Sequence, residues 1–409
     1  MADPRRASGS WRNTSPVLVT DAQAMGPIAV IRSLGRAGYP VHACAESERA
    51  LGLHSRFAAR SIVCPAYKTE AFLPWLREYI AREKISAIVP SEGFLLAVRG
   101  DIEEFLPILP LSRDPRVIFE GLSKCDLFEA FGGGTLPNQA LAHLPRSFLV
   151  RNEEEIPVES EWNRIGSPFF IKVDACHSRT GQQGSKVHRV SAVSEAQECV
   201  RNSLRGYHKV LVQGFVSGWG VGAFVLLWEG KLLAQFMHRR LHEVPHTGGA
   251  SSFRESWWNT EIRDDALSKL NAIRWQGVAM MEYRLNPSTG EFFLLEMNGR
   301  FWGSLHLALY AGVDFPRMLL DAFHGREPQP MHQFTRRVLC RDTFPREIQY
   351  VWSRWKDREL PLASRLGSIV EFFVLGLDPR VYADLWFPRD RRLYLLNLKR
   401  SIPDLFSRG

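Results

Sequence analysis

Residues 292–304, FFLLEMNGRFWGS, place polar groups directly after an apolar run. Phe292 to Leu295 has the character of a buried strand, and Glu296, Asn298 and Arg300 follow it at alternate positions. Alternate residues of a strand point to the same face, so these three side chains share one face if the strand continues that far. Two oxygen ligands beside a fixed cation are typical of a site for a hard metal ion and a phosphate.

The residues before this stretch predict that it is one arm of a β-hairpin. Val278 to Glu282 has strand character, and Asn286 to Gly290, NPSTG, supplies the turn. The turn makes the two strands antiparallel, so we expect Glu282 and Glu296 to converge. Two carboxylates and the Asn298 amide can complete Mg²⁺ octahedra together with triphosphate oxygens. Two Mg²⁺ ions would neutralise the charge that develops during phosphoryl transfer.

Composition is that of a globular protein of two or three domains. The chain has 409 residues, of which 45% are hydrophobic and 23% charged. The six cysteines form no CxxC pair, which predicts reduced thiols in a cytoplasmic protein. We also expect neither a signal peptide nor a membrane span, because no h-region and no 18-residue apolar run occurs.

The net charge of +8 is compatible with nucleic acid as a partner. However, the arginines are scattered and follow neither an RNP-like nor a zinc-finger pattern, so we predict no nucleic-acid partner. An arginine-rich surface with phosphate-handling sites explains the charge, and acidic substrates would be attracted by it.

Four regions are predicted along the chain. The polar, aperiodic start reads as a disordered arm. A βαβ pattern then indicates a Rossmann-like α/β domain with a parallel sheet, but it lacks GxGxxG and so does not predict dinucleotide binding. The predicted regions are 1–16 (arm), 17–115 (α/β domain), 116–325 (a second domain with lobes 140–215 and 216–325) and 326–409 (a basic, mostly helical extension).

The hairpin 277–304 resembles the metal-binding hairpin of the ATP-grasp superfamily. That pattern is a Glu in an E-[FY] step, a turn with Gly, and then E-[IVM]-N-x-R, versions of which occur in biotin carboxylases, carbamoyl-phosphate synthetases and D-alanine ligase-like enzymes. Within the superfamily, 236–252, FMHRRLHEVPHTGGASS, and 300–304, RFWGS, look like the predicted carboxylate–amine ligases of bacterial biosynthetic clusters.

Other segments fall in the order that this resemblance expects, and it covers residues 17–325. Pro168 to Lys172 resembles the strand whose lysine contacts ATP phosphates, and Ser123-Lys124 opens a helix as the upstream ATP-contacting lysine does. Val210 to Val216 resembles the interdomain strand that holds adenine with backbone groups. The cofactor contacts that the resemblance implies are therefore Lys124, Lys172, Gln213, Gly214, Phe215 and Val216.

The resemblance implies an α/β (α+β) ATP-grasp fold with a pre-ATP-grasp domain, and an ATP-dependent ligase. Such an enzyme phosphorylates a carboxylate and lets an amine displace the phosphate, which gives an amide, ADP and phosphate. Glu282, Glu296 and Asn298 would bind two Mg²⁺ ions, with Mn²⁺ as a substitute. The resemblance also implies that Arg300 stabilises the transferring phosphoryl group or the tetrahedral intermediate. Arg239 and Arg240 would bind the substrate carboxylate or phosphate.

Three features depart from the family pattern. The phosphate-covering loop has only Gly181 and Gly184 within HSRTGQQGS. The acidic residue at the adenine strand is absent, because Gly214 follows Gln213. The acidic ribose contact expected a few residues later is also a glycine, Gly220.

The sequence leaves several alternatives open. The enzyme could be an ATP-grasp phosphotransferase or carbamoyl-phosphate-type enzyme, or the chain a non-catalytic nucleotide-binding homologue. A histidine in 238–246 is either an acid–base group or structural, and Trp302 lines the pocket or belongs to the core. The basic tail is either a peripheral membrane element or a packed helical cap, and the resemblance also suggests a homodimer. The partners expected are a small carboxylate and an amine, which the sequence does not name.

Overall fold

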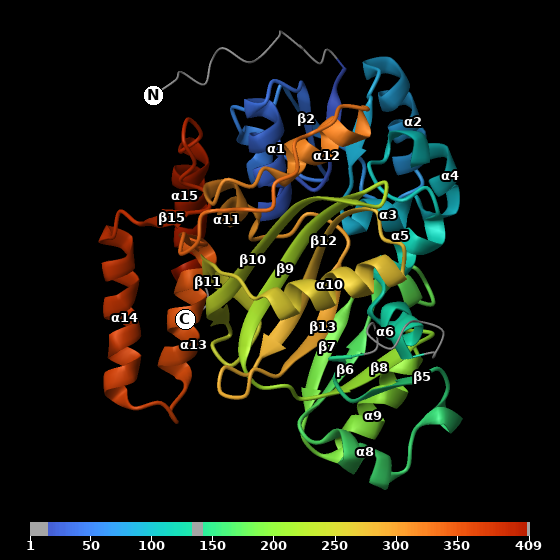
Figure 1. Cartoon of the computed structure of the whole chain (residues 1–409), viewed down its shortest axis with the longest axis vertical. Coiled ribbons are helices and arrows are strands. Elements are labelled where there is room, and N and C mark those ends of the chain that lie inside the picture. Colours follow the sequence, from blue (N-terminus) through green and yellow to red (C-terminus); the bar gives the residue numbers. More distant parts are fainter. Residues whose placement is uncertain (1–14, 133–141, 407–409) are drawn as a thin grey trace. The chain divides into compact units, whose positions relative to one another are not determined.

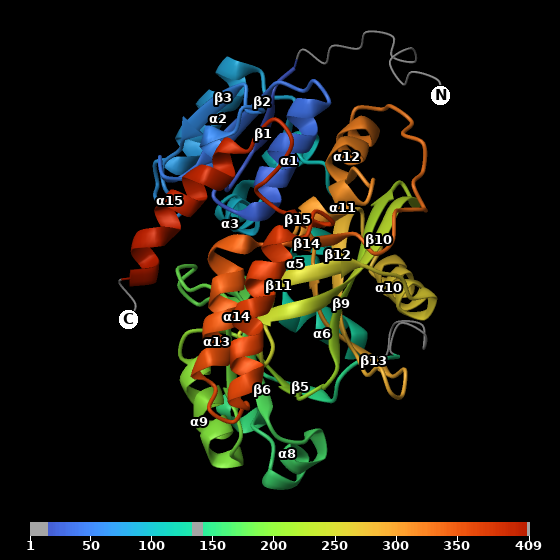
Figure 2. The same ribbon diagram turned by 90° about the vertical axis from the view of Figure 1, so that its left-hand side faces the viewer.

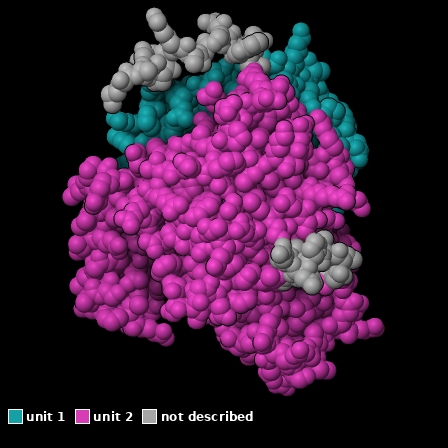
Figure 3. Space-filling view, in the orientation of Figure 1, with its two compact units in different colours: residues 1–110, 385–409 teal, residues 111–384 magenta. Residues whose placement is uncertain are grey.

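The computed structural model describes residues 15–132 and 142–406, and the predicted arm 1–16 lies outside this range apart from its last two residues. Figure 1 labels the helices and strands. The chain forms two compact units, coloured separately in Figure 3: residues 1–110 with 385–409, and residues 111–384.

The first unit contains a four-stranded parallel sheet in the order β3-β2-β1-β4. The buried β1 (Val17–Val19) pairs with β2 (Val41–Ala45) and β4 (Ala87–Val89), as expected for strands that helices cover on both sides. The predicted βαβ unit is therefore confirmed. The remaining elements of this unit are α1 (Met25–Arg36), η1 (Leu51–His54), β3 (Arg60–Val63), α2 (Phe72–Glu83), α3 (Glu92–Ala97), η2 (Arg99–Asp101), α4 (Ile102–Phe105), η3 (Leu106–Ile108) and α15 (Arg392–Phe406).

The end of the chain belongs to this first unit, so the segment 326–409 is divided between the two units. The Arg32 guanidinium on α1 donates to Asp390 Oδ2 at 3.0 Å, and both side chains are fully buried. Ser55 Oγ donates to the same carboxylate oxygen at 2.8 Å. Leu385 and Leu393 also pack into a small core with Ile28. Burial of a charge requires a partner, and here that partner lies 358 residues away in the sequence.

The second unit contains two sheets, which Figures 1 and 2 show with their covering helices. The larger has seven strands in the order β13-β12-β9-β10-β11-β14-β15, and the smaller is an antiparallel sheet in the order β5-β8-β6-β7. Their strands are β5 (Ser147–Val150), β6 (Phe169–Val173), β7 (Lys186–Val190), β8 (Val210–Gly214), β9 (Trp219–Trp228), β10 (Lys231–Val244), β11 (Ala250–Ser256), β12 (Gly277–Leu285), β13 (Phe292–Asn298), β14 (Leu339–Arg341) and β15 (Val381–Ala383).

The helices of the second unit precede β5 or lie between these strands in the sequence. They are α5 (Pro115–Leu122), α6 (Lys124–Gly132), η4 (Glu153–Glu155), α8 (Glu159–Ile165), η5 (Ala175–His177), α9 (Val193–Leu204), α10 (Thr260–Ala272), α11 (Leu305–Tyr310), α12 (Phe315–Phe323), η6 (Thr343–Glu347), α13 (Ile348–Lys356) and α14 (Leu362–Leu377). In the described part of the chain, no helix has both the length and the apolar character needed to cross a bilayer. All six cysteines are free thiols.

The predicted hairpin forms as β12 and β13, joined by the turn at 286–290. The strand ends differ from those that the sequence indicated. β12 continues past Glu282 to Leu285, and β13 ends at Asn298, so Arg300 lies beyond the strand. The hairpin is nevertheless in the register that faces Glu282 with Glu296. It packs on β9 at the edge of the larger sheet.

Candidate active site

Glu282 and Glu296 occupy directly opposed positions on β12 and β13. On the other side of β12, Glu282 is level with Gly222 of β9, which is in turn level with His238 of β10. The strand registers therefore place Glu296, Glu282, Gly222 and His238 in one row across the larger sheet. Like charges at opposed positions destabilise a sheet, so this row requires compensating groups nearby.

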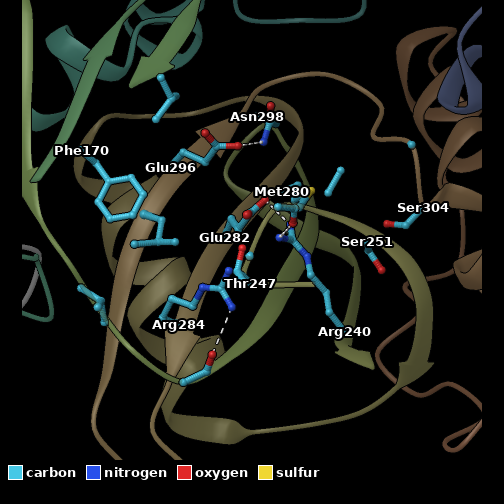
Figure 4. A pocket seen from close by; sticks show the side chains of 18 of the residues that line it. Phe170, Arg240, Thr247, Ser251, Met280, Glu282, Arg284, Glu296, Asn298 and Ser304 are labelled. Atoms are coloured by element: carbon cyan, nitrogen blue, oxygen red, sulfur yellow. Dashed lines mark hydrogen bonds and ion pairs between the residues drawn. The ribbon is translucent and has the colours of Figure 1, made fainter. Parts of the chain in front are cut away.

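Protein cations compensate both carboxylates. Lys124 Nζ, at the start of α6, lies 3.0 Å from Glu296 Oε2, and Arg240 Nη2 lies 2.5 Å from Glu282 Oε2. Asn298 Nδ2 donates to Glu296 Oε1 at 3.3 Å. Figure 4 shows Glu282, Glu296, Asn298 and Arg240 converging at one end of the hairpin. The structure therefore brings all three predicted metal ligands together.

The two opposed carboxylates have pKa shifts in opposite directions. Burial raises the pKa of Glu282, and the charge of Glu296 adds to this effect against the attraction of Arg240. Burial also raises the pKa of Glu296, but the ammonium groups of Lys124 and Lys172 lower it by more, to about 2. Glu296 is therefore held in the ionised form, whereas the pKa of Glu282 lies above its usual value.

Lys172 approaches the same place from the smaller sheet. Its Nζ donates to Gln213 Oε1 at 2.6 Å and to the Leu295 carbonyl at 3.4 Å. Burial lowers the pKa of Lys172 to about 8, although Glu296 raises it in part. A second anion beside Nζ would stabilise the protonated form, which is the form that binds phosphate.

A cavity of about 730 Å³ connects these groups. Its walls come from both sheets of the second unit and from the segments that precede β11 and follow β13. The lining includes Phe170, Lys172, Gln213 to Gly218, His238, Arg240, Thr247 to Ser251, Arg254, Met280, Glu282, Arg284, Glu296, Asn298, Arg300, Trp302 to Ser304, Asp342 and Arg346.

One side of the cavity is lined by two aromatic rings. The rings of Phe170 and Phe215 are stacked at 6.2 Å between centroids with 19° between their planes, and half of Phe215 is exposed. Phe170 precedes Lys172 by two residues on β6, so both point to the same side. A glycine is needed at 214, because a Cβ at this position would lie 2.3 Å from the Ile165 carbonyl oxygen at the end of α8.

The other side of the cavity is polar and contains unsatisfied groups. His238 is buried, and neither of its ring nitrogens has a hydrogen-bond partner among the described residues. Burial lowers the pKa of His238 well below its usual range, so the imidazole is neutral. Trp302 Nε1 also has no partner in the described part of the chain. Unpartnered buried donors and acceptors are costly, so a polar ligand in the cavity would relieve this cost.

Two arginines face each other on this polar side. Arg240 on β10 and Arg254 on β11 are paired in register, and Arg254 is ion-paired with Asp384. Burial raises the pKa of the neighbouring Asp342 to about 7. Two arginines, together with an aspartate whose negative charge is disfavoured, make this side of the cavity suitable for an anionic group on the ligand.

Glu243 occupies the space that the missing side chain at Gly220 leaves open. A Cβ on Gly220 would lie 2.4 Å from Glu243 Oε1. The two carboxylate oxygens are already paired, Oε1 with Arg240 at 3.3 Å and Oε2 with Arg284 at 2.9 Å. An acidic group does stand near the position where the family pattern expects one, but its contacts make it a positioning residue for two arginines.

The loop between β6 and β7 is held by hydrogen bonds. Asp174 Oδ2, at its start, accepts from Ser123 Oγ at 3.1 Å and from the Cys125 amide at 3.2 Å. Near the end of the loop, the Gly184 carbonyl accepts a hydrogen bond from Tyr207 Oη at 2.5 Å. The loop and the start of α6, which carries Lys124, are thus tied together.

Not all of the predicted site residues lie at the cavity. Arg300 and Arg240 line the cavity with Gln213 to Val216, while Lys124 reaches it through Glu296. Arg239 does not line the cavity: its guanidinium pairs with Glu255 at 2.8 Å and lies over the Trp219 ring. The reason is the two-residue period of β10, which points Arg239 to the face opposite that of its neighbours His238 and Arg240.

Sequence reasoning missed several groups at the cavity. Phe170 could have been found, because it shares a strand face with Lys172. His238 was one of several histidines with no signal to separate it from the others. Arg254, Asp342 and Arg346 come from distant segments that only the folded chain brings to the cavity.

The donor set of the hairpin fits Mg²⁺. Two carboxylates and an amide at one end of a hairpin are hard oxygen ligands, and they leave further positions to phosphate oxygens and water, which Mg²⁺ favours. Among the described residues, no group of three or more His, Cys, Asp or Glu side chains is arranged to hold a metal ion. The residues therefore fit a metal that binds together with a phosphate ligand rather than in an all-protein site.

No protein-family model matches the chain, and no curated protein matches it in sequence. Solved structures do match. An L-amino acid ligase from Bacillus licheniformis is 14% identical with a TM-score of 0.55, over 77% of this chain and 75% of that one. N5-carboxyaminoimidazole synthetase from Staphylococcus aureus is 12% identical with a TM-score of 0.58, over 78% and 79%. A biotin carboxylase from Campylobacter jejuni is 14% identical with a TM-score of 0.57, over 76% and 71%.

Each of these similarities extends over about three quarters of the chain. At such low identity they concern the fold and not the reaction. We conclude that this chain has the ATP-grasp fold, preceded by an α/β domain and followed by a mostly helical C-terminal region.

Proposed function

We propose that this protein is an ATP-dependent ligase that activates a carboxylate as an acyl phosphate and joins it to an amine. The observation that carries the proposal is the register of β12 and β13, which opposes Glu282 and Glu296 at the cavity that Lys172 and Arg300 also line. The solved structures of similar fold, which include an L-amino acid ligase and a biotin carboxylase, support this class of reaction.

ATP binds first in this proposal. The base lies against Phe170 and Phe215 and contacts the backbone of 213–216, while Lys172 and Lys124 receive the phosphates. Mg²⁺ held by Glu282, Glu296 and Asn298 would neutralise the charge on the transferring phosphoryl group. With the metal bound, Lys124 and Arg240 would no longer be needed as counter-ions of the two carboxylates, so Lys124 would be available to the phosphates and Arg240 to the carboxylate substrate.

The carboxylate substrate lies at the polar side of the cavity, where Arg240, Arg254 and Arg300 attract it. Its oxygen attacks the γ-phosphorus, the bond to the β-phosphate oxygen breaks, and ADP leaves. The amine nitrogen then attacks the acyl carbon, and phosphate leaves with the electron pair of the carbon–oxygen bond. We assign the amine proton to His238, because neither nitrogen of its buried ring has a hydrogen-bond partner among the described residues.

The test is release of ADP and phosphate by the purified protein with Mg²⁺-ATP, across pooled carboxylic acids and amines. Release that requires both an acid and an amine, and that falls by at least about 100-fold in Glu296→Gln, is the expected result. Glu291→Gln is the matched control, since Glu291 is an exposed carboxylate on the same hairpin. Unchanged release in Glu296→Gln would refute the assignment of the metal ligands.

His238→Ala separates the two half-reactions. Hydroxylamine is unprotonated at neutral pH and traps acyl phosphates without help from a base. We expect this variant to form hydroxamate but to lose amide formation with ordinary amines. Equal loss of both would mean that His238 has a structural role.

A non-catalytic nucleotide-binding protein is the second candidate. One observation favours it: both carboxylates already have protein counter-ions, Lys124 and Arg240. Calorimetry with Mg²⁺-ATP distinguishes this candidate from a phosphotransferase or carbamoyl-phosphate-type enzyme. Binding without turnover in any pool supports the non-catalytic candidate, whereas release with an acid alone supports an enzyme that stops at the acyl phosphate.

A further inference from the structure

Helix α14 presents an apolar face to solvent. Six large side chains on it are between 47% and 85% exposed: Leu362, Leu366, Val370, Phe373, Val374 and Leu377. Their spacing of three or four residues places them on one side of the helix. A surface helix normally turns this side to the core, so the orientation of α14 requires an explanation.

The opposite side of α14 is the one that packs against the protein. Ser368 is buried there, and Ser364 Oγ accepts a hydrogen bond from Arg354 of α13 at 2.6 Å. The Arg365 guanidinium lies over the ring of Trp355, which is itself 38% exposed and extends the apolar face onto α13. Figure 2 shows the two helices side by side. The α13–α14 hairpin is therefore anchored through the side of α14 that lies opposite the exposed apolar face.

The charges on α14 itself are not those of a helix that lies on a lipid surface. A helix that lies on a membrane usually carries many Lys and Arg residues on a strongly polar side opposite its apolar one. The sequence of α14 contains one Arg, which is stacked on Trp355, and one Glu, Glu371, whose side chain is 48% exposed. Anionic headgroups would repel Glu371.

The pattern of the apolar face fits a second copy of the same helix. Leu362 and Leu377 lie at equal distances from the midpoint of α14, as do Leu366 and Phe373. Two antiparallel α14 helices related by a two-fold axis would therefore place large side chains against large side chains along their whole length. Ala363 and Gly367, which share this side of the helix by spacing, allow the two backbones to approach closely.

The apolar face of α14 is also large enough to form a protein–protein interface. At about half exposure, seven side chains of this size present on the order of 700 Å². A standard protein–protein interface buries about 800 Å² on each partner. We propose that this apolar face of α14, with Trp355, binds the same face of a second copy of the chain, so that the protein is a two-fold symmetric dimer joined through α14.

The test is the molar mass of the full-length protein, measured by size-exclusion chromatography with multi-angle light scattering over a range of concentrations. We expect twice the chain mass of 46.6 kDa for the wild type. In Phe373→Glu the dissociation constant should rise by at least about tenfold, because a buried charge at the centre of the interface has no partner. Val158→Glu is the matched control, since Val158 is 70% exposed elsewhere and should leave the dimer intact.

A second variant covers the case in which Phe373→Glu does not fold. Val370 is adjacent to the midpoint of α14, so Val370→Cys should give a covalent dimer on mild oxidation that the wild type, with its own six cysteines, does not form. A wild type that is monomeric at all concentrations would overturn the proposal. So would a dimer that Phe373→Glu does not weaken and that Val370→Cys does not cross-link. Flotation of the monomeric protein with phosphatidylcholine or phosphatidylglycerol vesicles would assign the face to lipid instead.

Discussion

At the scale of single residues, the candidate site depends on how two lysines and Arg240 balance two carboxylates. Lys172 has the clearest electrostatic signature, because burial lowers its pKa to about 8 while Glu296 opposes that shift. In the free protein, Lys172 therefore loses its proton near pH 8. A bound phosphate stabilises the ammonium form and keeps Lys172 protonated to higher pH.

ATP binding should consequently weaken as the pH rises above 8. We expect calorimetry at pH 7 and pH 9 to show a larger dissociation constant at pH 9, with uptake of a proton on binding. Replacement of the charge in Lys172→Met should weaken binding by roughly 10- to 100-fold at pH 7, since a charged hydrogen bond contributes about 1.5–3 kcal/mol. It should also remove the pH dependence between 7 and 9; if that dependence persists in the variant, another group titrates.

At the scale of elements, His242 connects β10 to the α13–α14 hairpin. Its Nδ1 lies 3.2 Å from Glu347 Oε1, its Nε2 lies 3.5 Å from Glu371 Oε1, and its ring stacks on Tyr350 at 4.0 Å. Burial lowers the pKa of His242, but the two carboxylates raise it by more, to about 9. The protonated imidazole is thus the form that the folded protein prefers.

The pKa of His242 is higher in the folded than in the unfolded chain, where it is near 6.5. Its contribution to stability is therefore complete below pH 6.5 and is lost as the pH rises through 9, a change on the order of 3 kcal/mol. Urea unfolding at pH 6.5 and pH 9 should show a larger decrease in the free energy of unfolding for the wild type than for His242→Gln. His208→Gln, which changes an exposed histidine, should behave as the wild type; parallel curves for wild type and His242→Gln would contradict the prediction.

At the scale of the whole molecule, the last residues of the chain complete the N-terminal unit. Asp390 accepts hydrogen bonds from Arg32 and Ser55 and from the Arg56 amide, which lies 3.0 Å away. Because Arg32 is fully buried, removal of its counter-ion leaves an uncompensated charge in the core.

We expect Asp390→Ala to destabilise the N-terminal unit by about 3–5 kcal/mol. Asp378→Ala removes the partner of Arg380, whose side chain is 83% exposed, and should cost less than about 1 kcal/mol. Chemical unfolding and limited proteolysis of the two variants would measure the difference. Equal stability of both would show that the tail does not hold this unit together.

The sequence by itself determined the local elements of this protein and the face on which its key residues lie. The period of two along 292–298, and the turn at 286–290, were enough to predict that Glu282 and Glu296 converge, because a hairpin brings together residues close in sequence. The positions of Lys124 at a helix start and Lys172 near a strand end were also read correctly, since both depend on local patterns.

Only the tertiary structure decided which distant groups surround these residues. Arg239 and Arg240 are neighbours in sequence, yet the pleat of β10 points one away and the other to Glu282. Arg254, Asp342 and Arg346 line the cavity although they lie far from the hairpin in the sequence, and Asp390 pairs with the distant Arg32. No periodic pattern in the sequence encodes contacts over such separations. The physical reason is that a buried charge is tolerated only beside a partner, and the packing of the whole chain selects that partner.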